Sequence, residues 1–185
     1  MIELPKATNL LIAPPQMPDS RFQKAVMMLT HDHEGGSFAL CVNRPTHNTL
    51  TDIAREIDID LNLNFPMYWG GPVNSGVIWM LHSSEWSVDR TIELNDEWSM
   101  TSDVKMFYHL SDGDVPKHFR ITFGMCTWAP GQLESEMRGV PPWNKNASWL
   151  TAENPGPEWL IEMSPETLWE ASTALCSQQA VNSWF

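Results

Sequence analysis

The stretch that decides the fold is residues 25–45, AVMMLTHDHEGGSFALCVNRP. It contains two apolar runs, at 25–30 and 38–42, on either side of the polar segment HDHEGG. Two apolar runs around a polar connection that ends in Gly-Gly predict a β-hairpin with a longer loop. Asn43-Arg44-Pro45 ends the second run, because proline has no N–H to donate to a strand ladder. We therefore expect the fold to contain an antiparallel strand pair.

Further strands and a few helices mix along the chain without strict alternation. An apolar run at 9–13 stops at two prolines, and residues 76–82 are typical of a central strand after the sharp turn at Gly70-Gly71-Pro72. This mixture predicts an α+β fold in a single domain that spans 1–185. The remaining predicted elements are strands at 91–94 and 119–125, and helices from Thr49 or Thr51 to about 57, from about 101 to 110, and from Ser164 onward.

The composition excludes two classes of protein. With 185 residues, 42% of them hydrophobic, and ten tryptophans, the chain has enough apolar material for one folded domain, so disorder is excluded. Eleven Lys plus Arg against 23 Asp plus Glu give a formal net charge of −12. That excess repels phosphate backbones, so a general nucleic-acid-binding surface is disfavoured.

The targeting signals and cysteines are typical of a cytoplasmic protein. The only apolar run near the N-terminus, residues 10–13, is too short for a secretory signal, and no apolar segment is long enough to cross a bilayer. The three cysteines form no Cys-x-x-Cys pair and fit neither a disulfide framework nor a zinc ribbon. We therefore expect a cytoplasmic location and no membrane contact.

The last quarter of the chain is acidic. No Lys or Arg follows Lys145, and Pro165 after Ser164 predicts the start of a helix that covers a sheet. We interpret the glutamates as a solvated face on two short helices, with a specific acidic docking surface as the alternative. These glutamates are Glu153, Glu158, Glu162, Glu166 and Glu170.

Three further segments together carry a family likeness. The first runs from Leu11-Ile12-Ala13-Pro14 to GSFALCVNRP at 36–45, the second is Gly70-Gly71-Pro72-Val73, and the third is GMCTWAPGQLESE at 124–136. In order and spacing they resemble the bacterial YqgE/AlgH family over nearly the whole chain. Ala39 stands where that family usually has glycine, and Met125 where an aromatic residue is common, so the chain resembles a divergent member.

The resemblance implies an α+β fold in which a bifurcated mixed β-sheet curls into a pseudo-barrel with flanking helices. It also brings the label of transcriptional regulator, with no established catalytic residue, cofactor or substrate. The chain itself has no helix-turn-helix and no basic helix, and its negative charge argues against direct DNA contact.

The sharpest site hypothesis joins two distant turns. Pro130 predicts a helix start after Trp128, and free amides at a helix start attract anions. If the sheet brings Arg44 to this point, a pocket for a carboxylate or phosphate forms. The alternative is structural: Arg44 pairs with Glu134 or with the C-terminus of a helix, and Gln132 hydrogen-bonds to the backbone. The candidate ligand-binding residues are Asn43, Arg44, Gly70, Gly71, Trp128, Gln132 and Glu134.

Two other groups of residues are candidates for metal binding or catalysis. His31 and His33 lie two residues apart and can share one face of a strand, but no third metal ligand is evident, and we expect an exposed loop without metal. Cys126 and His82 form a nucleophilic pair only if the fold brings them within hydrogen-bond reach, and a free cysteine is usually packing material. Glu134 is expected to pair with Arg138 four residues on.

Three functions are therefore open. The leading one is a cytoplasmic, non-enzymatic regulator that binds an unknown protein partner or a small anionic ligand and needs no cofactor. The second is an enzyme with a concealed site around Cys126, His82 and Arg44. The third is direct DNA binding, which follows from the family label alone.

Overall fold

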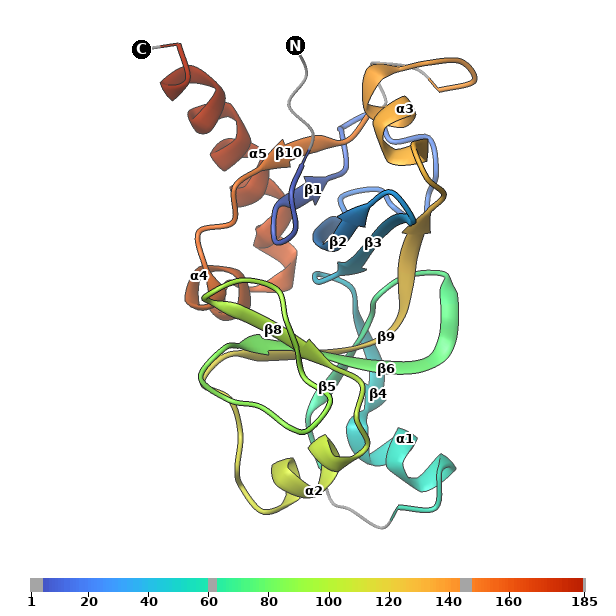
Figure 1. Cartoon of the computed structure of the whole chain (residues 1–185), viewed down its shortest axis with the longest axis vertical. Coiled ribbons are helices and arrows are strands. Elements are labelled where there is room, and N and C mark those ends of the chain that lie inside the picture. Colours follow the sequence, from blue (N-terminus) through green and yellow to red (C-terminus); the bar gives the residue numbers. More distant parts are fainter. Residues whose placement is uncertain (1–4, 60–62, 144–147, 185) are drawn as a thin grey trace.

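The computed structural model describes residues 5–59, 63–143 and 148–184 (Figure 1). Strands and helices alternate irregularly along the chain, as expected of an α+β protein. The strands are β1 (Leu10–Ile12), β2 (Val26–His33), β3 (Gly36–Cys41), β4 (Pro45–Thr49), β5 (Pro66–Trp69), β6 (Val73–Ser83), β7 (Ile92–Glu93), β8 (Trp98–Thr101), β9 (Phe119–Trp128) and β10 (Leu150–Ala152). The helices are α1 (Leu50–Glu56), α2 (Lys105–Ser111), α3 (Gln132–Arg138), α4 (Pro157–Glu162) and α5 (Pro165–Asn182).

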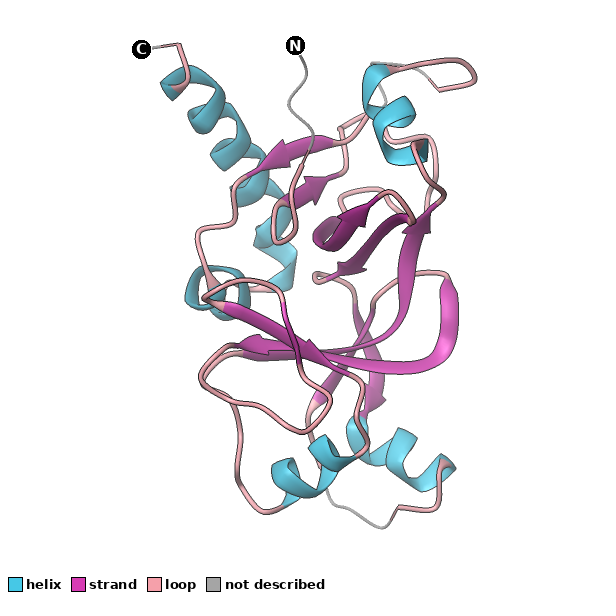
Figure 2. Ribbon diagram, viewed as in Figure 1, coloured by secondary structure: helices cyan, strands magenta, loops and turns pink. Residues whose placement is uncertain are grey.

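The sheet branches at β9. Its main path runs β10-β1-β2-β3-β9-β6-β8-β7, and β5 leaves this path by pairing with both β4 and β9. The end of β9 pairs with β3, where Ala39 faces Cys126, whereas its middle pairs antiparallel with β6 and parallel with β5. The curled sheet forms a half-barrel with helices on the outside (Figures 1 and 2), so the predicted bifurcated, mixed architecture is confirmed.

The hairpin of β2 and β3 is tighter than the sequence suggests. Strand β2 continues through the polar residues as far as His33, and only Glu34 and Gly35 form the turn. The prediction of a longer loop at 31–36 is therefore wrong. The register of the two strands shifts between Leu29 and His31, and this irregularity carries the polar segment into the ladder. Pro45 begins the edge strand β4, a position that needs no donated N–H.

Helix α1 begins as predicted, at Thr49. Asp52 accepts hydrogen bonds from the backbone N–H and the hydroxyl of Thr49, which completes a capping box. The predicted start of α5 at Ser164-Pro165 is also confirmed, but α5 has 18 residues and is not short. All five glutamates of the acidic segment are exposed, as a solvated face requires.

Three apolar clusters fill the fold. The first lies between the sheet and helices α4 and α5 and includes Trp98 and Leu168; the second includes β1 to β3, the end of β9 and Leu133 of α3; the third joins the sheet to α1 and α2 and includes Phe107. Several tryptophans belong to these clusters, so core packing accounts for much of the tryptophan content. Among the described residues, no helix is both long enough and apolar enough to span a membrane.

A buried arginine links the branches of the sheet. Arg120 is 5% exposed, donates to the carbonyls of Val42 and Ile161, and has its guanidinium carbon 4.4 Å from the centroid of the Tyr68 ring. Burial lowers the pKa of this guanidinium. Arg120 therefore fixes β3, β5 and α4 against one another.

Candidate functional site

Two hollows lie beside the loop that joins β1 to β2, and both are lined by Arg21. The first, the cationic hollow, has a volume of about 690 Å³. The second, the aromatic pocket, has a volume of about 480 Å³. The cationic hollow is lined by Pro14, Pro15, Ser20, Arg21, Gln23, Lys24, Arg44 and Trp169. The aromatic pocket is lined by Met17, Pro18, Asp19, Arg21, Phe22, Pro72, Val73, Cys126, Thr127, Trp128, Gln132, Glu136, Pro142, Trp143 and Trp149.

Asn43 holds this loop to the end of β3. Its side chain is 7% exposed, accepts the backbone N–H of Val26 at 2.8 Å and donates to the carbonyl of Lys24 at 2.9 Å. An unpaired buried amide or N–H costs roughly 1–3 kcal/mol, so these bonds matter for the loop. Asn43 is therefore a positioning residue behind the cationic hollow and lines neither hollow.

Arg44 lines the cationic hollow, where it donates through Nη2 to the carbonyls of Arg21 and Gln23. Within the described parts of the chain, no carboxylate lies at ion-pair distance from Arg44. Neither proposed structural partner is used: Glu134 pairs with Arg138 at 2.6 Å, and the two carbonyls that Arg44 contacts lie in turns of the loop between β1 and β2 and not at the end of a helix. The positive charge of Arg44 is fixed in place by neutral carbonyls and is not cancelled.

Two more cations complete the hollow. The ammonium of Lys24 lies 5.6 Å from the centroid of the Trp169 ring, at a distance that allows a cation–π contact. The indole N–H of Trp169 donates to the carbonyl of Ala13 at 2.8 Å, so α5 supplies a fixed aromatic wall. Arg21 forms an ion pair with Asp19 at 2.7 Å, and hydrogen bonds from Arg21 hold the pKa of Asp19 below its usual range.

Glu136 organises the aromatic pocket. Its Oε2 accepts the indole N–H groups of Trp128 at 3.1 Å and Trp149 at 3.0 Å, and its Oε1 accepts from Nε2 of Gln132 at 3.0 Å. The rings of Trp128 and Trp149 meet edge to face, with centroids 6.3 Å apart. The carboxylate therefore joins α3 to the end of β9 and to the segment before β10.

The start of α3 uses its own side chain to satisfy a free amide. Oε1 of Gln132 accepts the backbone N–H of Ala129 at 3.0 Å, while Gly131 caps the helix in the left-handed conformation. Gln132 therefore hydrogen-bonds to the backbone of the turn before α3, as the structural alternative predicts. The helix has only seven residues, and we assign it no anion site.

Gly70 and Gly71 lie where the chain crosses closely over β9. The carbonyl of Gly70 accepts the N–H of Cys41 at 2.8 Å, and a Cβ on Gly71 would lie 2.1 Å from the backbone carbon of Met125. No side chain fits at position 71. The pair lets the chain cross β9 closely, and neither glycine lines the cationic hollow or the aromatic pocket.

The structure thus divides the predicted site residues. Arg44 lines one hollow, whereas Trp128 and Gln132 line the other. Glu134 is paired on the outer side of α3 and lies in neither lining. Sequence reasoning missed Arg21, Lys24, Glu136 and Trp149. Of these, only Glu136 carried a signal, because its position two residues after Glu134 places it on another face of the helix.

The thiol and imidazole of the enzyme hypothesis lie far apart. His82 pairs with Phe119, and Cys126 lies seven residues further along β9, a path of about 23 Å. Cys126 is 3% exposed, and burial raises the pKa of its thiol well above the usual range. Burial lowers the pKa of His82, whose Nδ1 contacts the carbonyl of Ser83 at 2.9 Å. A dyad of these two residues is excluded.

The metal hypothesis concerns His31 and His33 on β2. The side chains of Asp32 and His33 lie outside the described residues, so the pair is not tested as ligands. In the parts of the chain that are described, no group of three or more His, Cys, Asp or Glu is arranged to hold a metal ion.

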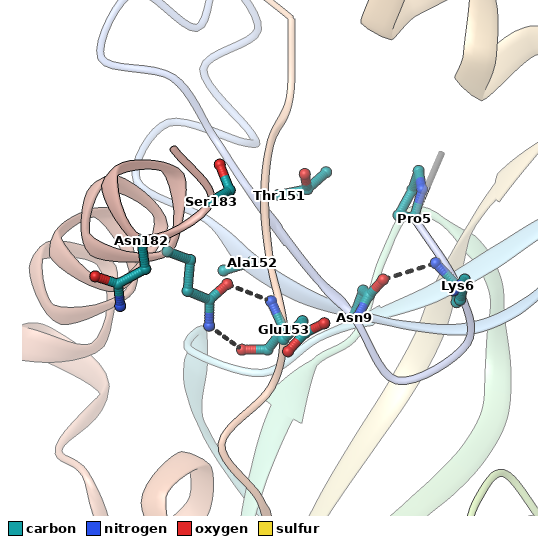
Figure 3. A pocket seen from close by; sticks show the side chains of 9 residues that line it. Pro5, Lys6, Asn9, Thr151, Ala152, Glu153, Asn182 and Ser183 are labelled. Carbon is teal, nitrogen blue, oxygen red and sulfur yellow. Dashed lines mark hydrogen bonds between the residues drawn. The ribbon is translucent and has the colours of Figure 1, made fainter. Parts of the chain in front are cut away.

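A third hollow lies where α5 passes β10 (Figure 3), with a volume of about 520 Å³. The side-chain amide of Gln179 accepts the backbone N–H of Glu153 at 2.7 Å and donates to its carbonyl at 3.1 Å. Among the described residues of its lining, Lys6 and Glu153 alone are charged, and they have opposite signs. This hollow has no concentration of charge or aromatic surface.

Comparison with known proteins agrees with the fold. The family model described as AlgH-like, DUF179, matches residues 10–180. A UPF0301 protein of Paraburkholderia phymatum is 33% identical over 172 residues, covering 90% of this chain and 86% of the relative. A UPF0301 protein of Rhizobium etli is 32% identical over 163 residues, covering 83% of this chain and 77% of the relative.

Two solved structures resemble the chain in three dimensions. The solution structure of the AlgH protein from Pseudomonas aeruginosa has a TM-score of 0.76 and 28% identity, and the match covers 95% of this chain and 92% of that one. The crystal structure of protein DIP2367 from Corynebacterium diphtheriae, at 19% identity and a TM-score of 0.64, shares the fold. Because the family model spans nearly the whole chain and the curated relatives are matched over most of their length, the chain belongs to the AlgH-like, UPF0301 family.

Proposed function

We propose that this protein is a cytoplasmic, non-catalytic regulator that binds a small anionic ligand, a phosphate or a carboxylate, in the cationic hollow. One observation carries the proposal: Arg44 and Lys24 line the same hollow, and within the described residues neither forms an ion pair. In a chain with only 11 Lys and Arg against 23 acidic residues, a hollow lined by three cations and no carboxylate is unusual.

The guanidinium of Arg44 is oriented for this role. Its Nη2 is held by two backbone carbonyls, whereas Nε and Nη1 make no hydrogen bond to the described residues. A guanidinium that is already fixed loses little rotamer entropy when it binds a planar carboxylate or a phosphate through two N–H groups. Lys24 adds a second charge beside it, and the aromatic wall of Trp169 limits where that charge can lie.

The same charge distribution argues against duplex DNA as the ligand. Duplex binding needs several phosphate contacts along a groove or helix, and its affinity rises with the number of cations that replace counterions. Here only three of the 11 Lys and Arg residues line the cationic hollow, and the net charge of the molecule is −12. We expect no measurable duplex binding at physiological salt, and a sub-micromolar, salt-dependent affinity would contradict the proposal.

The test is a titration with inorganic phosphate and with acetate at constant ionic strength, followed by NMR of the backbone amides of residues 19–24. We expect saturable shifts with a Kd in the millimolar range, about −4 kcal/mol. Arg44→Gln should weaken binding about tenfold or more, because it removes the charged fork. Arg55→Gln, an exposed arginine of α1, is the matched control and should bind as the parent does. Equal affinity in both variants, or no saturable shift, contradicts the proposal.

A protein partner is the second candidate function. The last turns of α5 extend past the sheet (Figures 1 and 2). Val181 in the last turn is 54% exposed, and Trp184, two residues beyond the end of the helix, is 84% exposed. Exposed large apolar side chains are frequent at protein interfaces. A partner that co-purifies with the parent protein should be lost from Trp184→Ser and kept by Tyr108→Ser, which removes an exposed aromatic side chain of α2 that lines neither hollow. Equal recovery with both variants argues against this surface.

A further inference from the structure

Three groups donate hydrogen bonds to the carboxylate of Glu136, and none of them is a cation. All three donors are neutral: the indole N–H groups of Trp128 and Trp149 and the side-chain amide of Gln132. Among the described residues, no Lys, Arg or His lies at ion-pair distance from Glu136. The negative charge is therefore fixed in position and not cancelled.

One acceptor position on this carboxylate is free. A carboxylate accepts about two hydrogen bonds on each oxygen. Oε2 already accepts from both indoles, whereas Oε1 accepts, among the described residues, from Gln132 alone. Since Glu136 lines the aromatic pocket, Oε1 offers an acceptor to an N–H donor inside it.

The walls of the pocket suit a cation with an apolar stem. Phe22, Trp128, Trp143 and Trp149 all line it, and Trp149 meets both Phe22 and Trp128 edge to face. The guanidinium carbon of Arg21 already lies 5.5 Å from the centroid of the Phe22 ring, so one of these rings accepts a guanidinium in the folded chain. Electron-rich ring faces attract ammonium and guanidinium groups and repel anions.

The charges in the lining favour the same sign of ligand. Asp19 and Arg21 neutralise each other through a bidentate contact, with Nη2 of Arg21 2.7 Å and Nε 3.1 Å from carboxylate oxygens of Asp19. Burial keeps the thiol of Cys126 protonated. Glu136 is then the one charge in the described lining without an ionic partner, and this described lining is negative.

We propose that the aromatic pocket is a binding site for an organic cation, an alkylguanidinium or alkylammonium group that donates an N–H to Oε1 of Glu136 and packs its stem against the tryptophans. The cation belongs either to a free small molecule or to an Arg or Lys side chain of a peptide. This site is separate from the cationic hollow, so either site can fail while the other holds.

The first test compares ligands that differ only in charge. The indole N–H signals of Trp128 and Trp149 are followed by NMR while n-butylguanidinium chloride, its neutral isostere n-butylurea, or sodium chloride is added at matched ionic strength. We expect saturable shifts with butylguanidinium alone. A capped tripeptide with a central arginine, compared with the same tripeptide carrying citrulline, distinguishes the peptide source from the free small molecule. Equal binding of the charged and neutral isosteres, or saturation by none of the cations, overturns the proposal.

The second test removes the charge. Glu136→Gln should weaken butylguanidinium binding about tenfold or more, since hydrogen bonds to charged groups are the stronger ones. Glu134→Gln is the matched control: it lies on the same helix, its carboxylate pairs with Arg138 outside the pocket, and its affinity should not change. Unchanged affinity in Glu136→Gln overturns the proposal. The dispersion of the backbone amide signals shows whether this variant is folded, and if it is not, the comparison of isosteres on the parent protein decides alone.

Discussion

The cationic hollow and the aromatic pocket share Arg21 and carry opposite charge. In the first, Arg44 is held by main-chain carbonyls; in the second, Glu136 is held by indole and amide N–H groups. Neutral dipoles fix the position of an ion but leave its charge for a ligand. The ion pair between Asp19 and Arg21 shows the contrary case, because each of its charges cancels the other. A charge is a good candidate for binding when its fixed partners are neutral.

The substitution with the largest expected effect should disrupt the cationic hollow and the aromatic pocket together. Gly71 has φ +156°, and a Cβ there would lie 2.1 Å from the backbone of Met125, so Gly71→Ala forces the crossing at β9 apart. We expect a loss of more than about 3 kcal/mol in the free energy of unfolding. Gly76→Ala is the control, since a Cβ at Gly76 meets nothing within 4 Å, and it should change stability by less than about 0.5 kcal/mol. Urea denaturation measures both, and similar losses for the two variants would show that the crossing is not tight.

The second prediction concerns the thiol that lines the aromatic pocket and has no counterpart in the cationic hollow. Because burial raises the pKa of Cys126, iodoacetamide at neutral pH should alkylate it at least about a hundredfold more slowly than in the urea-unfolded chain. Mass spectrometry of tryptic peptides gives the rate. Cys176, which is only partly buried, is the internal control and should react faster than Cys126 in the folded protein. Rapid labelling of Cys126 would revive the enzyme hypothesis.

A third substitution should disrupt the aromatic pocket and leave the cationic hollow intact. Glu136→Ala leaves two indole N–H groups without their acceptor, and we expect it to lower the free energy of unfolding by about 2 kcal/mol. Glu134→Ala loses an exposed i,i+4 ion pair and should cost about 0.5 kcal/mol or less. Thermal or urea unfolding compares them. Phosphate titration should give the parent affinity for both, and loss of phosphate binding in Glu136→Ala would mean that the two regions are coupled.

The smallest expected effect concerns Arg21, the residue that lines both the cationic hollow and the aromatic pocket. Asp19→Asn frees Arg21, so phosphate should bind the cationic hollow about twofold to fivefold more tightly at pH 7. Since the pKa of Asp19 is lowered in the folded protein, its contribution to stability is present above about pH 4 and is lost as the pH falls through the folded pKa. The parent and Asp19→Asn should therefore converge in phosphate affinity at low pH. A difference in phosphate affinity that stays constant as the pH falls would show that the substitution does not act through the charge of Asp19.

Sequence reasoning predicted the elements whose signals are local. Thr49 with Asp52 and Ser164 with Pro165 marked the starts of two helices, and the pairing of Glu134 with Arg138 followed from helical spacing alone. The bifurcated sheet came from the family resemblance. Short edge strands such as β4 and β10 were missed, because three to five residues without apolar alternation carry little information.

The sequence predicted only part of the candidate site, and the reason is physical. The sequence identified Arg44 and Trp128 as important, but only the register between β3 and β9 decides which hollow each one lines. Helical spacing places Glu136 on another face of α3 than Glu134, yet the two indole donors of Glu136 come from residues that are 8 and 13 positions away along the chain. Such contacts depend on tertiary packing, which composition and periodicity do not specify.

The side-chain amide of Gln179 bears on how copies of this protein behave at high concentration. By bonding both the N–H and the carbonyl of Glu153, it occupies the groups that a further strand would use beyond the outermost strand of the sheet. Open strand edges recruit other chains and promote aggregation. We therefore expect helix α5 to protect this edge of the sheet, and loosening it should expose backbone groups at which other chains can pair.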